Sequence, residues 1–308
     1  MKNIFLSAAF LAVVLLHVAC GQQKKSESRG ADNKGTKAIH AFYIGHSLSN
    51  PIVGRIFSLA HHHEKTEFSI RYQTNPGSSL QQSWEIKNQG YTAIEPYYAG
   101  YYDTRYGLPT GGFDVLVLTE SVPRHLGEGI ARTYQYADSM YRFATEYNPD
   151  IQVYLYEIWH CIYSGTPTAC YYDIDANPWR QRLDDDLPMW ESVVDTLNSR
   201  FNPAKPVKLI PGGQGMAALY DAVMAGEVPG VATLDDLFTD DIHISGISAY
   251  LVACVHFATI YGESPVGLPN MLTDLWGNPC EDNPTPEQAA ILQEIAWKVV
   301  NEYTSGPF

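Results

Sequence analysis

Apolar residues recur along the chain in short runs that have the length of β-strands. Several of these runs are apolar on both faces, which is typical of strands buried inside a parallel sheet. The five runs cover residues 39–45, 68–72, 115–118, 153–158 and 207–210.

Between these runs the apolar residues follow the spacing of helices. The last helix is expected to begin at Thr285-Pro286-Glu287-Gln288, a capping box with proline at the first helical position. The other expected helices cover residues 51–63, 134–147, 183–200, 216–225 and 245–261. Alternation of strands and helices predicts an α/β fold, a three-layer α/β/α sandwich around a mostly parallel five-stranded sheet.

The first 20 residues have the features of an export signal. Lys2 precedes an apolar run from Ile4 to Leu16, which is short for a membrane span but typical of a signal peptide. The following Ala-Cys-Gly, centred on Cys20, resembles a bacterial lipobox, in which the cysteine is acylated and becomes the mature N-terminus. Export as a lipoprotein of the outer membrane, periplasm or cell surface is expected, with simple secretion as the alternative.

Residues 21–38 are polar and lack periodicity, so we expect a flexible tether there. No internal repeat or second linker follows, and residues 39–308 are therefore expected to form one domain. A lipid on Cys20 would hold this domain at a membrane without any membrane-binding face.

The charge balance excludes some classes of partner. The chain has 20 Lys and Arg against 34 Asp and Glu, a net charge of −14. Because phosphate backbones and anionic membranes attract basic surfaces, we expect neither a nucleic-acid partner nor direct binding to an anionic membrane.

Four cysteines follow Cys20, and an even number in an exported protein suggests disulfides. Cys161 and Cys170 flank a turn-rich stretch that could close into a small loop. Cys254 lies in an expected helix, where a buried free thiol is common. The pairing, including that of Cys280, stays open at this stage.

Two short segments carry residues suited to nucleophilic catalysis. Ser47 lies in the turn between the first strand and the first helix, near unpaired N–H groups that could stabilise an oxyanion. Asp240 and His243 are three residues apart in a loop before an apolar helix, where the carboxylate could orient the imidazole. Each segment alone could be a simple cap or turn, but the two together are more specific.

These segments resemble blocks of the SGNH (GDSL-like) hydrolase superfamily. The resemblance lies in the order and spacing of blocks, and the matching stretches are YIGHSLS at 43–49, PGSSL at 76–80, DVLVLTES at 114–121 and the block at 240–265. It implies a sandwich like that of flavodoxin, with Ser47 as nucleophile, His243 as base and Asp240 as its orienting residue. It also implies that the N–H groups of Ser47 and Gly77 are oxyanion donors.

The third block departs from the family pattern. The family places an Asn or Gln there as a further oxyanion donor, whereas this chain has Thr119, Glu120 and Ser121. Thr119 could donate one hydrogen bond, but an ionised Glu120 would repel an oxyanion. The missing donor could be supplied by Thr119, by Ser121, by another loop or by His46, which lies beside the nucleophile. Alternatively, the enzyme could be slow.

Other histidines give no metal-site pattern. His61, His62 and His63 occupy successive helix positions and cannot converge on one ion. His125 and His160 follow expected strands and could line the site, whereas His256 lies in an apolar helix and is expected in the core or at an interface. Since no phosphate-binding loop is present either, we expect no metal and no cofactor.

Two aromatic stretches, 91–106 and 159–179, follow expected strands and should lie at the carboxyl edge of the sheet. Their rings could stack on sugars, or they could simply fill irregular loops. The favoured hypothesis is a serine esterase for O-acyl esters, above all O-acetyl esters, of a polysaccharide or small molecule. The alternatives are a weak or inactive glycan-binding protein on the same scaffold and, with less support, a lipase or thioesterase.

Overall fold

A computed structural model describes residues 39–63, 68–88, 97–125, 128–167, 170 and 172–305. All of these lie in one compact unit, Thr36–Phe308. The expectations for the signal peptide, the lipid on Cys20 and the tether fall on residues 1–38, outside the described part. No helix among the described residues has the length and apolar character needed to span a bilayer.

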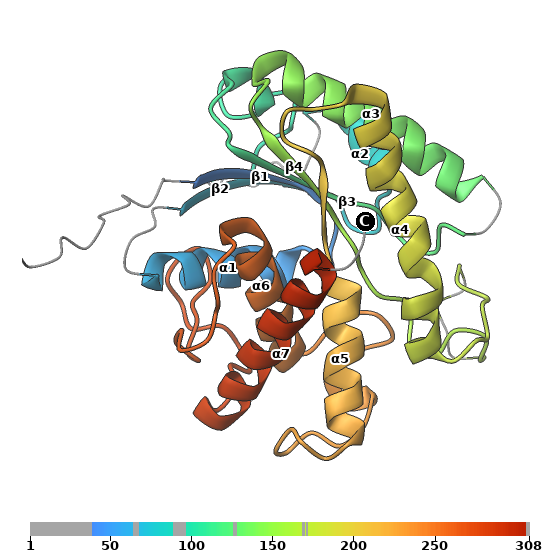
Figure 1. Cartoon of the computed structure of the whole chain (residues 1–308), viewed down its shortest axis with the longest axis vertical. Helices are drawn as coiled ribbons and strands as arrows, with labels where there is room; N and C mark the ends of the chain where they lie inside the picture. The colour runs from blue at the N-terminus through green and yellow to red at the C-terminus, as the bar shows by residue number, and fades with distance from the viewer. Residues whose placement is uncertain are drawn as a thin grey trace, which may run out of the picture. The chain divides into compact units, whose positions relative to one another are not determined.

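The five expected strands form one parallel sheet in the order β2-β1-β3-β4-β5 (Figure 1). Their bounds are Ile39–Gly45 for β1, Phe68–Thr74 for β2, Val115–Thr119 for β3, Gln152–Tyr156 for β4 and Lys208–Ile210 for β5. This is the flavodoxin-like strand order, in which ligands bind outside the carboxyl ends of the strands. The predicted fold class is confirmed.

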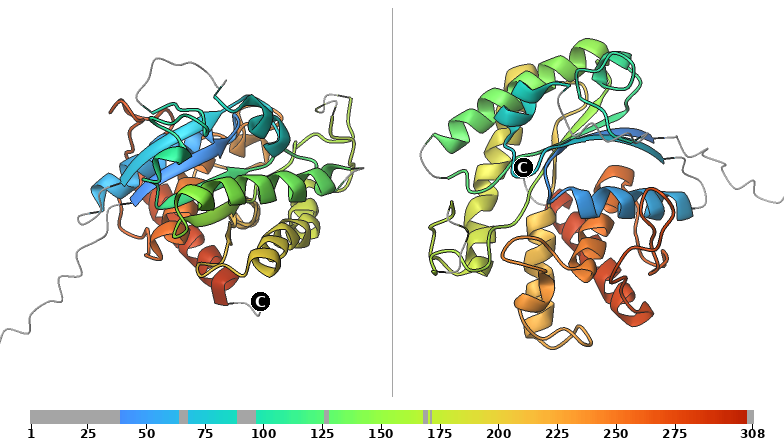
Figure 2. Two further views of the ribbon diagram at one scale, coloured as in Figure 1. Left: turned by 90° about the horizontal axis from the view of Figure 1, so that it is seen from above. Right: turned by 180° about the vertical axis from the view of Figure 1, so that it is seen from behind.

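Helices cover both faces of the sheet (Figures 1 and 2). One layer contains α1 (Asn50–His62), α5 (Gly212–Met224), α6 (Gly246–Tyr261) and α7 (Pro286–Ser305). The opposite layer contains α2 (Leu80–Ile86), α3 (Gly129–Tyr147) and α4 (Trp179–Phe201). Short 3-10 turns lie at Leu108–Thr110 and Asp235–Leu237. The structure is therefore a three-layer α/β/α sandwich.

The local signals at helix ends act as expected. The Gln288 N–H donates to Thr285 Oγ1 at 3.2 Å, and the Thr285 N–H donates to Gln288 Oε1 at 2.8 Å, which completes the capping box of α7. Gly262 ends α6 with a φ of +67°, a conformation that glycine adopts without steric cost.

Four helices differ from the sequence expectation. The short α2 was not expected, and three helices begin earlier than expected: α3 at Gly129 rather than 134, α4 at Trp179 rather than 183, and α5 at Gly212 rather than 216. The earlier start of α4 follows from burial, because Trp179 and Arg182 are both inside the protein and bring the first turn of the helix into the core.

Parallel pairing brings the ends of β1, β3 and β4 to the same edge of the sheet. Val117 on β3 pairs with Tyr43 on β1 and with Tyr154 on β4, and all three side chains are buried. The segments that leave these strands therefore start side by side, and the candidate site is built at this edge.

Candidate active site

Ser47 lies in a tight turn between β1 and α1. The Ser49 N–H donates to the His46 carbonyl at 2.9 Å, and the Asn50 N–H donates to the Ser47 carbonyl at 3.2 Å. Gly45, the last residue of β1, allows this close turn: a Cβ there would lie 2.4 Å from Ser49 Oγ and 2.9 Å from Thr119 Oγ1.

A hydrogen-bonded chain joins Ser47 to the loop before α6. Ser47 Oγ lies 2.9 Å from His243 Nε2, and His243 Nδ1 lies 2.7 Å from Asp240 Oδ2. The two segments are 196 residues apart in the sequence. The structure thus brings together the three residues that the motifs assign to nucleophile, base and orienting group.

The partners of His243 determine which ring nitrogen carries the proton. An ionised carboxylate only accepts hydrogen bonds, so Nδ1 donates to Asp240 and Nε2 is left to accept from the Ser47 hydroxyl. This is the tautomer that a general base requires at a serine.

Backbone groups fix the carboxylate of Asp240. Its Oδ1 accepts from the N–H groups of Ile242 at 2.9 Å and His243 at 2.7 Å. Partial burial would raise the pKa of Asp240, but these two bonds and the bond from the His243 ring outweigh it and hold the pKa below its usual value. Asp240 is therefore ionised at neutral pH and keeps the imidazole oriented.

Ser47 and His243 open into a pocket of about 820 Å³, here named the Ser47 pocket. The site is accessible, since the side chains of His243 and Asp240 are 42% and 55% exposed. The lining residues are His46, Ser47, Leu48, Pro76, Gly77, Ser121, Val122, Pro123, Arg124, Tyr172, Ile242 and His243.

Two backbone N–H groups at the pocket are free to donate. Within the described residues, neither the Ser47 nor the Gly77 N–H has a hydrogen-bond acceptor. Gly77 has a φ of +65° with open space where a Cβ would lie, so glycine is needed there for its backbone conformation and not for room. The structure thus places both expected oxyanion donors beside the expected nucleophile.

Thr119 does not reach the pocket. Its side chain is fully buried, and its Oγ1 lies 3.1 Å from Ser49 Oγ, behind the turn that carries Ser47. The expectation that Thr119 donates to an oxyanion is therefore corrected: its hydroxyl is used to hold the turn.

Glu120 is likewise turned away from the pocket. Its Oε1 accepts from the N–H groups of Leu80 at 3.1 Å and Ser121 at 2.8 Å and from Arg124 at 2.9 Å, and its Oε2 accepts from Thr133 at 2.9 Å. The expected repulsion between Glu120 and an oxyanion is corrected, because the carboxylate is neutralised by Arg124 and buried. Glu120 instead connects β3 with the starts of α2 and α3.

His46 lines the pocket but has both ring nitrogens engaged. Its Nε2 lies 3.2 Å from the Glu120 carbonyl, and its Nδ1 accepts from the Leu48 N–H at 3.4 Å. Burial lowers the pKa of His46 to about 4, although the bond to the Glu120 carbonyl opposes the shift. The ring is neutral, with its only N–H directed to Glu120, so it is not free to act as an oxyanion donor.

Several of the pocket residues were not assigned a role at the site from the sequence, among them Arg124, Tyr172 and Ile242. Arg124 was missed, although its position shortly after a predicted strand is a usable signal. Tyr172 lies in an aromatic stretch that was expected at this edge but was not singled out, and Ile242 lies between the Asp240 and His243 motif residues. His125 and His160, which could have lined the site, do not line this pocket.

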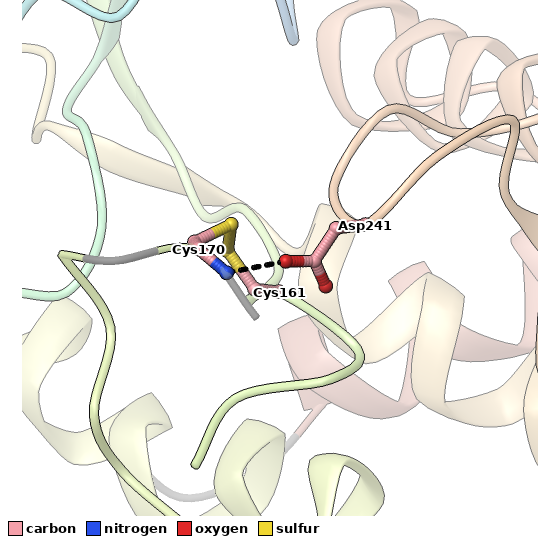
Figure 3. A group of neighbouring side chains, drawn as sticks. All are labelled: Cys161, Cys170 and Asp241. Carbon is pink, nitrogen blue, oxygen red and sulfur yellow. Dashed lines mark hydrogen bonds between the residues drawn. A yellow bond between two sulfur atoms is a disulfide. The ribbon is translucent and has the colours of Figure 1, made fainter. Parts of the chain in front are cut away.

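The cysteines give one disulfide, Cys161–Cys170, with its Cα atoms 6.4 Å apart. Asp241 lies beside it, as Figure 3 shows. Both sulfur atoms are bonded to each other, so this group cannot supply two thiolate ligands to a metal. Cys254 is buried and free, as the sequence suggested, and Cys280 is also free.

Comparisons with known proteins give likeness in structure alone. No family model and no curated protein matches the sequence. A DUF4886 family protein from Bacteroides uniformis is 14% identical over 88% of this chain and 98% of its own, with a TM-score of 0.56.

Two further structures match at lower scores. The first is an acetyl xylan esterase, which is 14% identical over 72% of this chain and all of its own, with a TM-score of 0.45. The second is a member of the lipolytic G-D-S-L family from Veillonella parvula, which is 15% identical over 71% of this chain and 96% of its own, with a TM-score of 0.40. The likeness to the DUF4886 family protein, together with the strand order, confirms the predicted α/β fold.

Proposed function

We propose that the protein is a serine esterase that hydrolyses O-acyl esters, above all O-acetyl esters, of carbohydrates. The observation that carries the proposal is the chain of hydrogen bonds from Ser47 through His243 to Asp240 at an open pocket. A hydroxyl bonded to an imidazole that a carboxylate orients is the arrangement of an activated nucleophile.

In the first half-reaction, Ser47 Oγ forms a bond to the ester carbonyl carbon while its proton passes to His243 Nε2. The N–H groups of Ser47 and Gly77 are placed to bind the resulting oxyanion, and Asp240 stabilises the imidazolium. The bond to the leaving alkoxide then breaks, and His243 returns the proton to the released sugar hydroxyl.

In the second half-reaction, water loses a proton to His243 and attacks the acyl-enzyme. The tetrahedral intermediate collapses, His243 returns the proton to Ser47, and the carboxylic acid leaves. This sequence needs no group besides the chain and water.

Ser121 is the best-placed candidate for a third oxyanion donor. It lines the pocket, and Arg124 donates to its Oγ, which leaves the hydroxyl proton of Ser121 available. The alternative acceptor, Glu120 Oε1, lies 3.4 Å away and already accepts from three other donors. Ser121→Ala is expected to lower kcat about 100-fold with little change in KM, as for loss of one oxyanion donor.

Export and lipid attachment at Cys20 complete the proposal. The Cys161–Cys170 disulfide supports an oxidising compartment. The intact mass of protein from a bacterial membrane fraction, compared with that of Cys20→Ser, tests the lipid. A lipoprotein shows an acyl-modified Cys20 at the N-terminus, and the variant stays unprocessed.

The proposed activity is tested with a small acetyl ester. The wild type should hydrolyse it, and Ser47→Ala should lose about 10⁶-fold in turnover. Ser139→Ala is a matched control, because Ser139 is partly buried on α3, is outside the Ser47 pocket and donates to the Gln135 carbonyl of its own helix. A glycan-binding protein without activity would also fail to react with a fluorophosphonate at Ser47.

A further inference from the structure

Asp241 connects the loop that the disulfide closes to the segment that carries Asp240 and His243. Its Oδ1 accepts from the Tyr163 N–H at 2.9 Å, and its Oδ2 accepts from the Cys170 N–H at 2.6 Å (Figure 3). Its carbonyl accepts from the Ile162 N–H at 2.9 Å. One residue thus binds both ends of the disulfide loop.

The neighbouring residue adds a further contact. The Trp159 indole N–H donates to the Ile242 carbonyl at 2.7 Å, and the Trp159 side chain is fully buried. Asp240 and Asp241 therefore have different roles although they are adjacent. Asp240 holds the His243 ring, and Asp241 holds the disulfide loop.

The disulfide in turn contacts an aromatic residue of the Ser47 pocket. Tyr172 follows Cys170 by two residues and lines the pocket together with Ser47 and His243. Its hydroxyl lies 3.7 Å from Cys161 Sγ, and the residue is 44% exposed. The ring is thus held at one end by the disulfide and keeps a large exposed surface at the site.

We propose that Tyr172 is a specificity-determining residue whose ring packs on the sugar of the ester substrate, and that Asp241 is a positioning residue that holds this ring in place through the disulfide loop. The inference rests on the proposed esterase function. Aromatic rings offer a flat apolar face with a polar tip, which suits the apolar face of a pyranose. Asp241 acts on specificity and touches neither the reacting atoms nor His243.

The test compares a sugar ester with an ester that lacks a sugar. The kcat/KM ratio for glucose pentaacetate over triacetin is measured for the wild type, Tyr172→Ala, Tyr172→Phe and Tyr106→Ala. Tyr106 is a matched control, being 49% exposed and outside the Ser47 pocket. Because the ratio cancels the concentration of folded enzyme, a variant that only folds poorly leaves it unchanged.

Tyr172→Ala should lower the ratio about fivefold to tenfold through a higher KM for the sugar ester, the size expected for one lost ring contact. Tyr172→Phe and Tyr106→Ala should keep the wild-type ratio. A wild-type ratio below one, or an unchanged ratio in Tyr172→Ala, overturns the inference while the esterase function stands. A wild type that hydrolyses neither ester overturns the proposed function itself.

The role of Asp241 is tested by a double-mutant cycle. Asp241→Asn keeps one acceptor oxygen but turns an amide donor toward one of the two loop N–H groups, so it should lower the ratio to nearly the value of Tyr172→Ala. Adding Tyr172→Ala to this variant should then change the ratio less than about twofold, because coupled residues give non-additive effects. If the two substitutions instead lower the ratio independently, so that their fold-changes multiply in the double variant, Asp241 does not position Tyr172.

Discussion

Two of the histidine–aspartate pairs near the carboxyl edge of the sheet, His243–Asp240 and His160–Asp186, have opposite surroundings. In the first pair, His243 lies 2.7 Å from Asp240, and the two side chains are 42% and 55% exposed. In the second, His160 Nε2 lies 2.9 Å from Asp186, with exposures of 0% and 12%. The chemical groups are the same in both pairs.

The pairs differ in the partner of the second ring nitrogen. Arg182 donates to His160 Nδ1 at 3.0 Å, so this nitrogen is an acceptor, and the other ring nitrogen lies 2.9 Å from Asp186 Oδ2. In His243 the ring proton faces Asp240, and the other nitrogen accepts from Ser47. The His243–Asp240 pair can act as a base on Ser47 because the second ring nitrogen of His243 lies against the Ser47 hydroxyl at a pocket. The buried His160–Asp186 pair has a structural role instead.

The largest effect is expected at His243. His243→Ala should lower turnover about 10⁶-fold, since among the described side chains it is His243 that bonds Ser47 Oγ and can take its proton. The residue is partly exposed, so the melting temperature should change little. Kinetics and thermal melts of the purified variant check this, and a variant that keeps a hundredth of the wild-type rate would remove His243 from the mechanism.

Asp240→Asn should lower turnover about 10⁴-fold, because the amide would turn an N–H toward His243 Nδ1 and favour the wrong ring tautomer. Asp236→Asn is the control: Asp236 is exposed, bonds Ala232 and Thr233, and is outside the Ser47 pocket. Both variants are assayed with the same acetyl ester. Equal rates for the two would show that the carboxylate of Asp240 has no special role.

Sequence alone located these three residues because local constraints act on each. Ser47 lies in the turn just after a buried strand, and Asp240 reaches His243 within one turn. Parallel strand pairing then defines the edge at which the two segments can meet. The strands were also recognisable, since they are apolar on both faces.

The third oxyanion donor could not be assigned from the sequence. The partner of Thr119 is Ser49, 70 residues away, and Glu120 is bound by Leu80 from a helix whose existence was not expected. Whether an ionised glutamate repels an oxyanion depends on these distant contacts. The disulfide also stayed open, because a turn-rich loop allows Cys161 and Cys170 to pair without requiring it.

A change at Arg182, which contacts the second pair, is expected to lower stability without an effect on catalysis. Arg182 donates to Asp173 at 2.9 Å and to His160, and its side chain is 2% exposed. Arg182→Leu removes the cation from the buried Asp173 carboxylate and the donor from His160 Nδ1, and it should lower the free energy of unfolding by about 3–5 kcal/mol. Urea denaturation measures the change.

Arg180→Leu provides the control for this variant. Arg180 is paired with Asp221 at the surface, and its loss should cost less than about 1 kcal/mol. Equal midpoints for the two arginine variants would contradict the structural role assigned to the buried pair.

The smallest effect concerns a third histidine, His256, which is fully buried in α6 as expected from the sequence. Burial lowers the pKa of His256 from 6.5 to about 3, so the unfolded chain takes up a proton that the folded protein excludes. The contribution of His256 to the free energy of unfolding is therefore fully present above about pH 6.5. It is lost progressively as the pH falls toward the folded-state pKa.

Between about pH 7 and about pH 5, His256 should account for a loss of about 2 kcal/mol. His256→Phe should therefore lose about 2 kcal/mol less than the wild type over this interval, in urea titrations at several pH values. Parallel stability curves for the two proteins would show that His256 does not titrate on unfolding.

The most direct test of the esterase mechanism is the site of the acyl-enzyme. The wild type is mixed with an acetyl ester, quenched in acid within the first turnovers, digested and analysed by mass spectrometry. The account predicts one acetyl group on the peptide that contains Ser47, and none on that peptide in His243→Ala. Turnover by the wild type with the acetyl group on another residue, or with equal acetylation in both proteins, would contradict it.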